Sequence, residues 1–133
     1  KQNYMYAFIQ KFHSGWAYLA LLLLVITVLN SVLGMVSKKE FSSKDRTIAL
    51  LGLIFSHVQL LVGFVLYFLP EQKLGVVNAD HPYVNILAII LITIGWSKHK
   101  KATTSEAKFR TISIFYGIGL LLILARIPWH LWF

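Results

Sequence analysis

Four long apolar segments separated by short polar ones are the feature that most constrains the fold of this chain. They cover residues 16–36, 48–69, 83–96 and 112–132, and none of them contains an aspartate or a glutamate. About 20 helical residues are needed to cross the ~30 Å hydrocarbon core of a bilayer. The composition agrees with membrane insertion, because 57% of the residues are hydrophobic and only 14% are charged, against roughly 25% charged in soluble domains.

The sequence therefore predicts an all-α fold, an integral membrane four-helix bundle made of one domain over residues 1–133. The expected helices lie at about 14–37, 47–69, 82–97 and 110–132. The third apolar segment is the shortest, so we expect its flanking residues to extend it. Pro82 suits the first turn of that helix.

The distribution of basic residues predicts an orientation. Nine of the thirteen lysines and arginines lie in two segments, 37–46 and 97–110. The positive-inside rule makes these segments cytoplasmic and leaves both termini on the outer side of the membrane. The net charge of +8 does not indicate nucleic-acid binding, because the basic residues form no stripe on a soluble face. Anionic lipid is the expected partner of the two basic segments.

Several function classes are disfavoured by residues that the sequence lacks. Cysteine is absent, which excludes disulfides, thiolate nucleophiles, iron–sulfur ligation and covalent c-type haem attachment. No carboxylate lies within the apolar segments, whereas ion-driven pumps usually rely on one. No nucleotide-binding loop or catalytic triad pattern is visible. We therefore expect an electron-transfer or accessory subunit rather than a stand-alone enzyme.

Small and polar residues at helical spacing predict the inward face of each helix. The stripe on the first helix is His13, Ala17, Ala20, Leu24, Thr27, Ser31 and Gly34, and that on the second is Gly52, Ser56, Gln59 and Gly63. The third carries His81, Asn85, Ala88, Ile92 and Gly95, and the fourth carries Tyr116, Gly119, Ile123, Arg126 and His130. Asn30 lies close to the first stripe and is expected to hydrogen-bond a neighbouring helix.

His13 and His81 form the sharpest candidate site. The first and third helices run parallel, so both histidines fall at the outer ends of inward-facing stripes. Neutral imidazole is a good iron ligand, and helix bundles build haem sites from facing side chains. This pattern predicts axial ligation of a haem b by His13 and His81, with Arg126 neutralising the propionates. The alternative is that both histidines only hydrogen-bond at the interface and that Arg126 snorkels.

The other three histidines, His57, His99 and His130, are interpreted separately. His57 lies roughly 16 Å along the helix from Arg46, near the midplane, and points away from the inward stripe. It is either a functional intramembrane group, facing a partner subunit or a quinone ring, or a neutral imidazole bonded to a neighbouring helix. His130 is interpreted as interfacial, and His99 as part of a solvated basic loop.

Several motifs together resemble a known family. They are HSGWAYL at 13–19, FSHVQLLVGF at 55–64, HPYVNILAIILITIGWSKHKK at 81–101 and FYGIGLLLILARIPW at 115–129, with the loop KKEFSSKDRTIAL. This set is similar to small bacterial four-helix inner-membrane proteins commonly labelled cytochrome b-like, over almost the whole chain. The resemblance implies a haem-binding role for His13, His57 and His81.

The leading hypothesis is a b-type cytochrome-like protein of the inner membrane. It holds one haem near the outer surface and relays electrons to a larger respiratory complex or a quinone. The competing hypothesis is a haem-free accessory or assembly subunit, whose apolar outer faces pack against a larger inner-membrane complex and whose histidines only hydrogen-bond.

Overall fold

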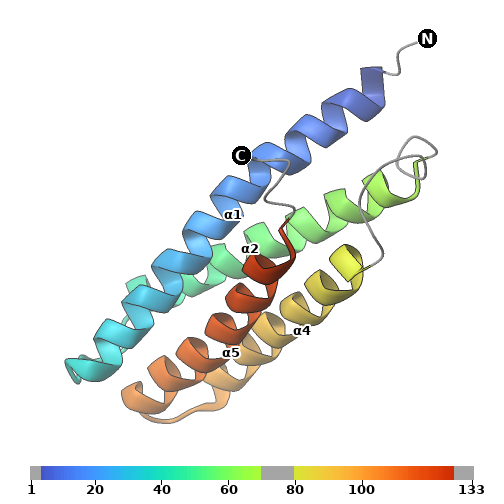
Figure 1. The fold of residues 1–133 in the computed structure, drawn as a ribbon. Helices are drawn as coiled ribbons and strands as arrows, with labels where there is room; N and C mark the ends of the chain where they lie inside the picture. Colours follow the sequence, from blue (N-terminus) through green and yellow to red (C-terminus); the bar gives the residue numbers. More distant parts are fainter. Residues whose placement is uncertain (1–3, 70–79, 128–133) are drawn as a thin grey trace.

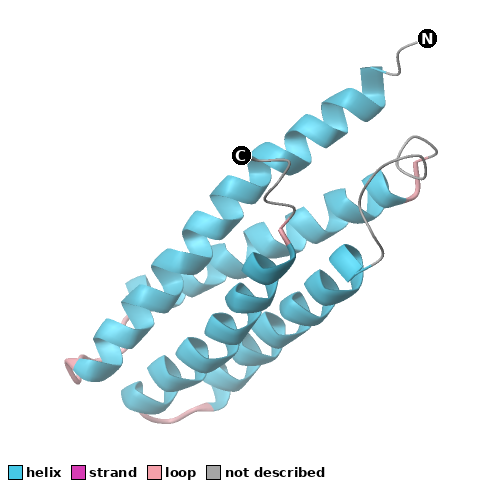
Figure 2. Cartoon of the chain, in the orientation of Figure 1, coloured by secondary structure: helices cyan, strands magenta, loops and turns pink. Residues whose placement is uncertain are grey.

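The computed structural model describes residues 4–69 and 80–127, with only the backbone described for Asp80 and His81, and these residues are almost entirely helical (Figure 1). The helices are α1 (Tyr4–Val36), α2 (Ser43–Tyr67), α4 (Asp80–Lys101) and α5 (Ser105–Arg126). The described residues contain no strand, and short loops join α1 to α2 and α4 to α5 (Figure 2). The prediction of an all-α four-helix fold is confirmed.

The helices run alternately up and down, so the first residue of α1 and the last of α5 lie at the same end (Figure 1). We call the opposite end, which holds the loops 37–42 and 102–104, the loop end. Helix α1 packs against α2 and α5, and α4 packs against α5 and α2. The order around the bundle is therefore α1, α2, α4, α5, which places α1 and α4 diagonally.

The inward face of α1 was predicted correctly from its small residues. Its buried residues are Ala20, Leu24, Thr27, Ser31 and Gly34, all from the predicted stripe. Gly52 and Ser56 of α2, Ala88, Ile92 and Gly95 of α4, and Tyr116 and Gly119 of α5 are buried as well. A stripe of small side chains lets neighbouring backbones approach, which is how helices associate where water supplies no driving force.

Glycines mark the closest approaches between helices. A Cβ on Gly119 would lie 2.7 Å from Cγ1 of Ile92 and 2.9 Å from the backbone oxygen of Ala88 on α4. A Cβ on Gly34 would lie 2.5 Å from the ring of Phe109, which joins α1 to α5. Larger residues at these positions would push the helices apart.

The hydrophobic core lies in the half of the bundle nearer the loop end. It consists of Leu24, Ala49, Leu53, Ile92, Trp96, Ile112, Tyr116 and Leu120. The hydroxyl of Tyr116 donates to the backbone oxygen of Ala49 at 2.8 Å, so α5 is hydrogen-bonded to α2 inside this core. The bond satisfies a hydroxyl that would otherwise be costly to bury.

A network around Asp45 joins three segments at the loop end. The carboxylate of Asp45 is buried and accepts from Asn30 of α1 at 2.9 Å and from Lys39 of the loop at 3.0 Å. It also accepts from the backbone of Ser42 at 2.8 Å, while the Ser42 side chain caps α2 in a capping box. The expectation that Asn30 bonds a neighbouring helix is confirmed.

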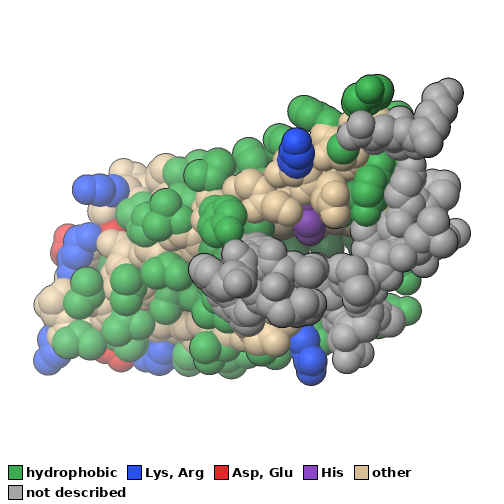
Figure 3. Space-filling view, turned by 45° about the horizontal axis from the view of Figure 1, so that its top comes forward, with side chains coloured by type: hydrophobic (Ala, Val, Ile, Leu, Met, Phe, Trp, Pro, Cys, Tyr) green, Lys and Arg blue, Asp and Glu red, His purple; other side chains and the backbone are tan. Residues whose placement is uncertain are grey.

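Three helices, α1, α2 and α5, are long and apolar enough to cross a membrane. Helix α4 is not among them, because its apolar segment of residues 83–96 is only about 21 Å long, short of the ~30 Å core. Apolar side chains cover the flank of the bundle, and most charged side chains of this face gather at the loop end (Figure 3). This pattern indicates a membrane protein.

The observed helices extend beyond the predicted ones at several ends. Helix α1 begins at Tyr4 rather than near residue 14, and α2 begins at Ser43 rather than near 47. Helix α4 continues to Lys101 rather than ending near 97, and α5 begins at Ser105 rather than near 110. Caps at Ser42 and Thr104 explain the early starts, because each side chain accepts from a backbone N–H in the first helical turn.

Replacing Gly119 by alanine should destabilise the bundle, because the added Cβ would overlap Ile92 and the α4 backbone. We expect a loss of about 1–3 kcal/mol, as for other overpacked cores. The matched control is Gly117→Ala on the same helix, whose Cβ would meet nothing within 4 Å. Unfolding in detergent should show the control unchanged or stabilised by up to about 1 kcal/mol. Equal losses in both variants would contradict the close α4–α5 approach.

Replacing Asp45 by alanine should also destabilise the protein, because Asn30, Lys39 and the start of α2 lose a shared partner. We expect a loss of about 2–3 kcal/mol in the free energy of unfolding. Glu40→Ala is the control, since Glu40 is an exposed acid in the same loop and should change stability by less than about 0.5 kcal/mol. Similar unfolding curves for the two variants would show that the Asp45 network contributes little to the stability of the folded protein.

Candidate functional site

His13 lies on α1 with its imidazole turned toward α2. The side chain is half-buried, and a Cβ on Gly63 would lie 3.3 Å from its Cε1 atom. The Nε2 atom of Gln59 donates to the backbone oxygen of His13 at 2.8 Å, which ties this turn of α1 to α2. The absence of a side chain at Gly63 therefore leaves space for the imidazole ring. The Gln59 bond holds this turn of α1 at a fixed position along α2.

The described side chains around His13 are more exposed than those at the loop end. On α1 no described residue before Ala20 is buried, on α4 none before Ala88, and on α5 none after Leu120. On α2 Leu66 is the one buried residue beyond Ser56. The inward stripes continue past these positions, so the side chains facing the interior at the His13 end are half-buried.

The other residues predicted for the outer site are only partly described. The backbone of His81 lies in the first turn of α4, at the same end of the bundle as His13, but its side chain and the whole of His130 lie outside the described residues. Arg126 is the last residue of α5 and is exposed. The described residues contain no group of three or more metal-ligating side chains. The His13–His81 pairing therefore stays a prediction, as does the role of Arg126.

His57 of α2 contacts Thr93 of α4. Its Nε2 atom lies 2.8 Å from Oγ1 of Thr93, and that hydroxyl donates to the backbone oxygen of Ile89 at 2.7 Å. Since the single hydroxyl proton of Thr93 is used in this bond, Thr93 accepts from His57, so Nε2 carries a proton. The imidazole is exposed on the outside of the bundle. The bond to a neighbouring helix, which one of the two interpretations of His57 expected, is present, and the functional role of His57 stays a prediction.

His99 is placed differently from the prediction. It was expected in a solvated basic loop, but it is only 1% exposed and lies in the last turn of α4. Its Nδ1 atom donates to the backbone oxygen of Trp96 at 2.5 Å, and its ring contacts Phe41, with centroids 5.5 Å apart. The prediction was wrong because the lysines around His99 suggested a loop, whereas the helix continues through them. A step of four from Gly95 along the inward stripe would have indicated its burial.

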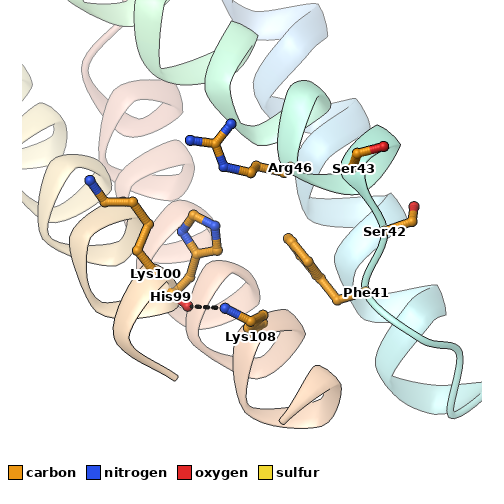
Figure 4. A pocket seen from close by; sticks show the side chains of 7 residues that line it. All are labelled: Phe41, Ser42, Ser43, Arg46, His99, Lys100 and Lys108. Atoms are coloured by element: carbon orange, nitrogen blue, oxygen red, sulfur yellow. Dashed lines mark hydrogen bonds between the residues drawn. The ribbon is translucent and has the colours of Figure 1, made fainter. Parts of the chain in front are cut away.

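His99 forms part of the wall of a pocket of about 310 Å³ at the loop end (Figure 4). Basic side chains surround it: Arg46 of α2, Lys100 of α4 and Lys108 of α5. The remaining wall residues are Phe41, Ser42 and Ser43. The Nζ atom of Lys108 donates to the backbone oxygen of His99 at 2.9 Å, and the guanidinium of Arg46 lies 5.2 Å from the centre of a Trp96 ring. Contacts with the protein thus position these cations around the pocket.

Burial lowers the pKa of His99 below its usual 6.5, and the charges of Lys108, Arg46 and Lys100 lower it further. The hydrogen bond to Trp96 opposes this shift. The imidazole is therefore neutral at pH 7, with its proton on Nδ1. Nε2 is left as the unprotonated nitrogen.

Comparisons with known proteins identify no relative. No family model, curated protein or solved structure matches this chain.

The hydrogen bond between His57 and Thr93 can be measured with a double-mutant cycle of His57→Leu and Thr93→Val. We expect a coupling of about 0.6–1.7 kcal/mol in the free energy of unfolding, the range found for hydrogen bonds between membrane helices. The same cycle with His57→Leu and Thr111→Val, which is on α5, should give a coupling near zero. Zero coupling in both cycles would mean that His57 and Thr93 are not bonded in the folded protein.

Proposed function

We propose that this chain is a b-type cytochrome-like membrane protein, with one haem held at the end of the bundle opposite the loops. His13 from α1 and His81 from α4 would be the axial ligands. Arg126 at the end of α5 would balance the propionates. The protein would carry electrons as part of a larger inner-membrane complex or to a quinone.

The observation that carries this proposal is the placement of His13. Its imidazole lies against Gly63, on a helix face predicted to point inward, rather than toward lipid. The surrounding side chains are half-buried, unlike the tightly packed loop end. A flat cofactor between helices needs such a combination of a directed imidazole and small neighbouring residues.

The arrangement of the helices is compatible with a bis-histidine site. Helices α1 and α4 lie diagonally across the bundle, and the first turn of α4 is at the His13 end. When bound, haem supplies one-electron redox chemistry at its iron. The chain would hold the ring through His13, fix the height of α1 through the Gln59 bond, and exclude water with the apolar residues of the four helices.

The proposed orientation places the loop end in the cytoplasm of a bacterial cell. The basic residues at that end support it through the positive-inside rule. Helix α4 would span the membrane with help from its flanks and from α5, against which it packs. Both termini and the haem would then be on the periplasmic side.

The test is a reduced-minus-oxidised absorption spectrum of protein purified after haem-replete expression. We expect a b-type α-band in the wild type and its loss in His13→Ala and in His81→Ala. His57→Ala is the matched control, because it removes an equivalent side chain that is bonded to Thr93, and it should keep the band.

Other outcomes of this experiment would change the proposal in defined ways. Loss of the band only in His57→Ala would move the haem to His57 on α2. The absence of a band in the folded wild type would contradict the cytochrome proposal. The remaining candidate would then be an accessory subunit whose exposed apolar faces pack against a larger complex.

A further inference from the structure

We infer that the pocket at the loop end binds a phosphate group, carried by an anionic lipid or by a free phosphate compound. The pocket is lined from three helices and is separate from the histidine site at the other end (Figure 4). This inference does not depend on the presence of haem. It follows from the charges, the donors and the position of the pocket.

The cations around the pocket have no carboxylate partner within the described part of the chain. The two ion pairs described there join Lys39 to Asp45 and Arg110 to Glu106. Asp45 is the acid nearest to Arg46 in sequence, but its carboxylate is taken up by Asn30, Lys39 and Ser42. No acidic residue lines the pocket. Three cationic groups around one cavity repel each other, so a bound anion would stabilise them.

Contacts with the protein hold the three cations beside the pocket. Arg46 and Lys100 both lie over Trp96, at 5.2 and 5.8 Å from the ring centre. Lys108 is fixed by its bond to the backbone oxygen of His99. Arginine and lysine together suit a phosphate, because the guanidinium offers a planar pair of donors and the ammonium a compact charge.

Helix α2 adds a favourable field. It is 25 residues long and begins at Ser43, in the wall of the pocket. The N-terminus of a long helix carries partial positive charge and attracts anions, and the Asp45 carboxylate in the first turn of α2 offsets only part of this charge. Ser43 itself is one of the residues that line the pocket.

His99 supplies a buried polar group that distinguishes the pocket from an ordinary basic surface. It is 1% exposed, its Nδ1 is bonded to Trp96, and no described residue hydrogen-bonds Nε2. The charged groups facing the ring are Arg46 of α2, Lys100 of α4 and Lys108 of α5, all cationic. A phosphate would offset these charges and accept from a protonated Nε2. Binding should therefore raise the pKa of His99, which gives a direct spectroscopic signal.

The position of the pocket allows both sources of phosphate. It lies where the apolar segments end, next to the aromatic ring of Phe41. At the proposed orientation this is the level of the cytoplasmic lipid headgroups, where basic pockets between helices bind anionic lipid. The pocket is also reached from the aqueous side through the exposed residues Ser42 and Lys100.

The experiment compares a pocket variant with a charge-matched control. The pocket variant is Arg46→Gln with Lys100→Gln, and the control is Lys98→Gln with Lys101→Gln, which removes the same charge from exposed residues outside the pocket. Lys108 is left intact because it bonds the α4 backbone. Thermal unfolding is used to check that both variants are folded and as stable as the wild type. If the pocket variant is unstable, the single variant Lys100→Gln replaces it.

One arm uses nanodiscs of mixed phosphatidylglycerol and phosphatidylcholine, with retained lipid measured by native mass spectrometry. The other arm uses phosphatidylcholine nanodiscs and inorganic phosphate, with the ¹⁵N resonances of the His99 imidazole followed against pH. We expect the wild type and the control to bind alike, and the pocket variant to bind about tenfold more weakly. A raised His99 pKa should accompany binding.

The outcomes separate the two sources. Selective retention of phosphatidylglycerol that is lost in the pocket variant identifies the lipid headgroup. A phosphate-dependent shift at His99 without lipid selectivity identifies a free phosphate compound. No binding in either arm, or equal weakening in the pocket and control variants, would overturn the inference. A missing haem band leaves this result unaffected, so failure of one proposal is distinguishable from failure of the other.

Discussion

The close approach of helices through small residues is the constraint on which the rest of this structure depends. In a membrane, apolar side chains gain little by leaving lipid, so packing and hydrogen bonds must hold the helices together. Gly119 lets α5 approach the α4 backbone, and Gly34 receives the ring of Phe109. Tyr116 of α5 also lies at hydrogen-bond distance from Ala49 on α2. The core and the pocket at the loop end are each formed by side chains from several helices, so both depend on these helix spacings.

The two ends of the bundle are built differently, and this difference separates the two proposed sites. At the loop end, short loops, two helix caps and the Asp45 network leave the side chains tightly packed. Unpaired cations gather there because they lie beyond the apolar segments, where water or headgroups can solvate them. At the other end the inward stripes carry His13 and small residues among half-buried side chains. The proposed cofactor site lies at the second end, and the proposed anion site lies at the first.

The histidines show how far a sequence can predict a site in this chain. Spacing alone placed His13 on an inward face, since small residues follow it at steps of four and three. The same spacing would have reached His99 from Gly95, but the adjacent lysines suggested a solvated loop. Spacing could not reveal that Phe41, over fifty positions earlier, covers the His99 ring. For His57 the outward direction was predicted, whereas its bond to Thr93 depends on how α2 and α4 align.

The sequence by itself determined the helical class, the apolar segments and the inward face of α1, because hydrophobicity and helical periodicity are local properties. It also indicated the charge difference between the two ends. Only the tertiary structure decided which helices are neighbours, that Asp45 links α1 to α2, and that Arg46, Lys100 and Lys108 surround one pocket. These features depend on the register and rotation of helices distant in sequence, which are set by the packing of whole surfaces rather than by any single segment.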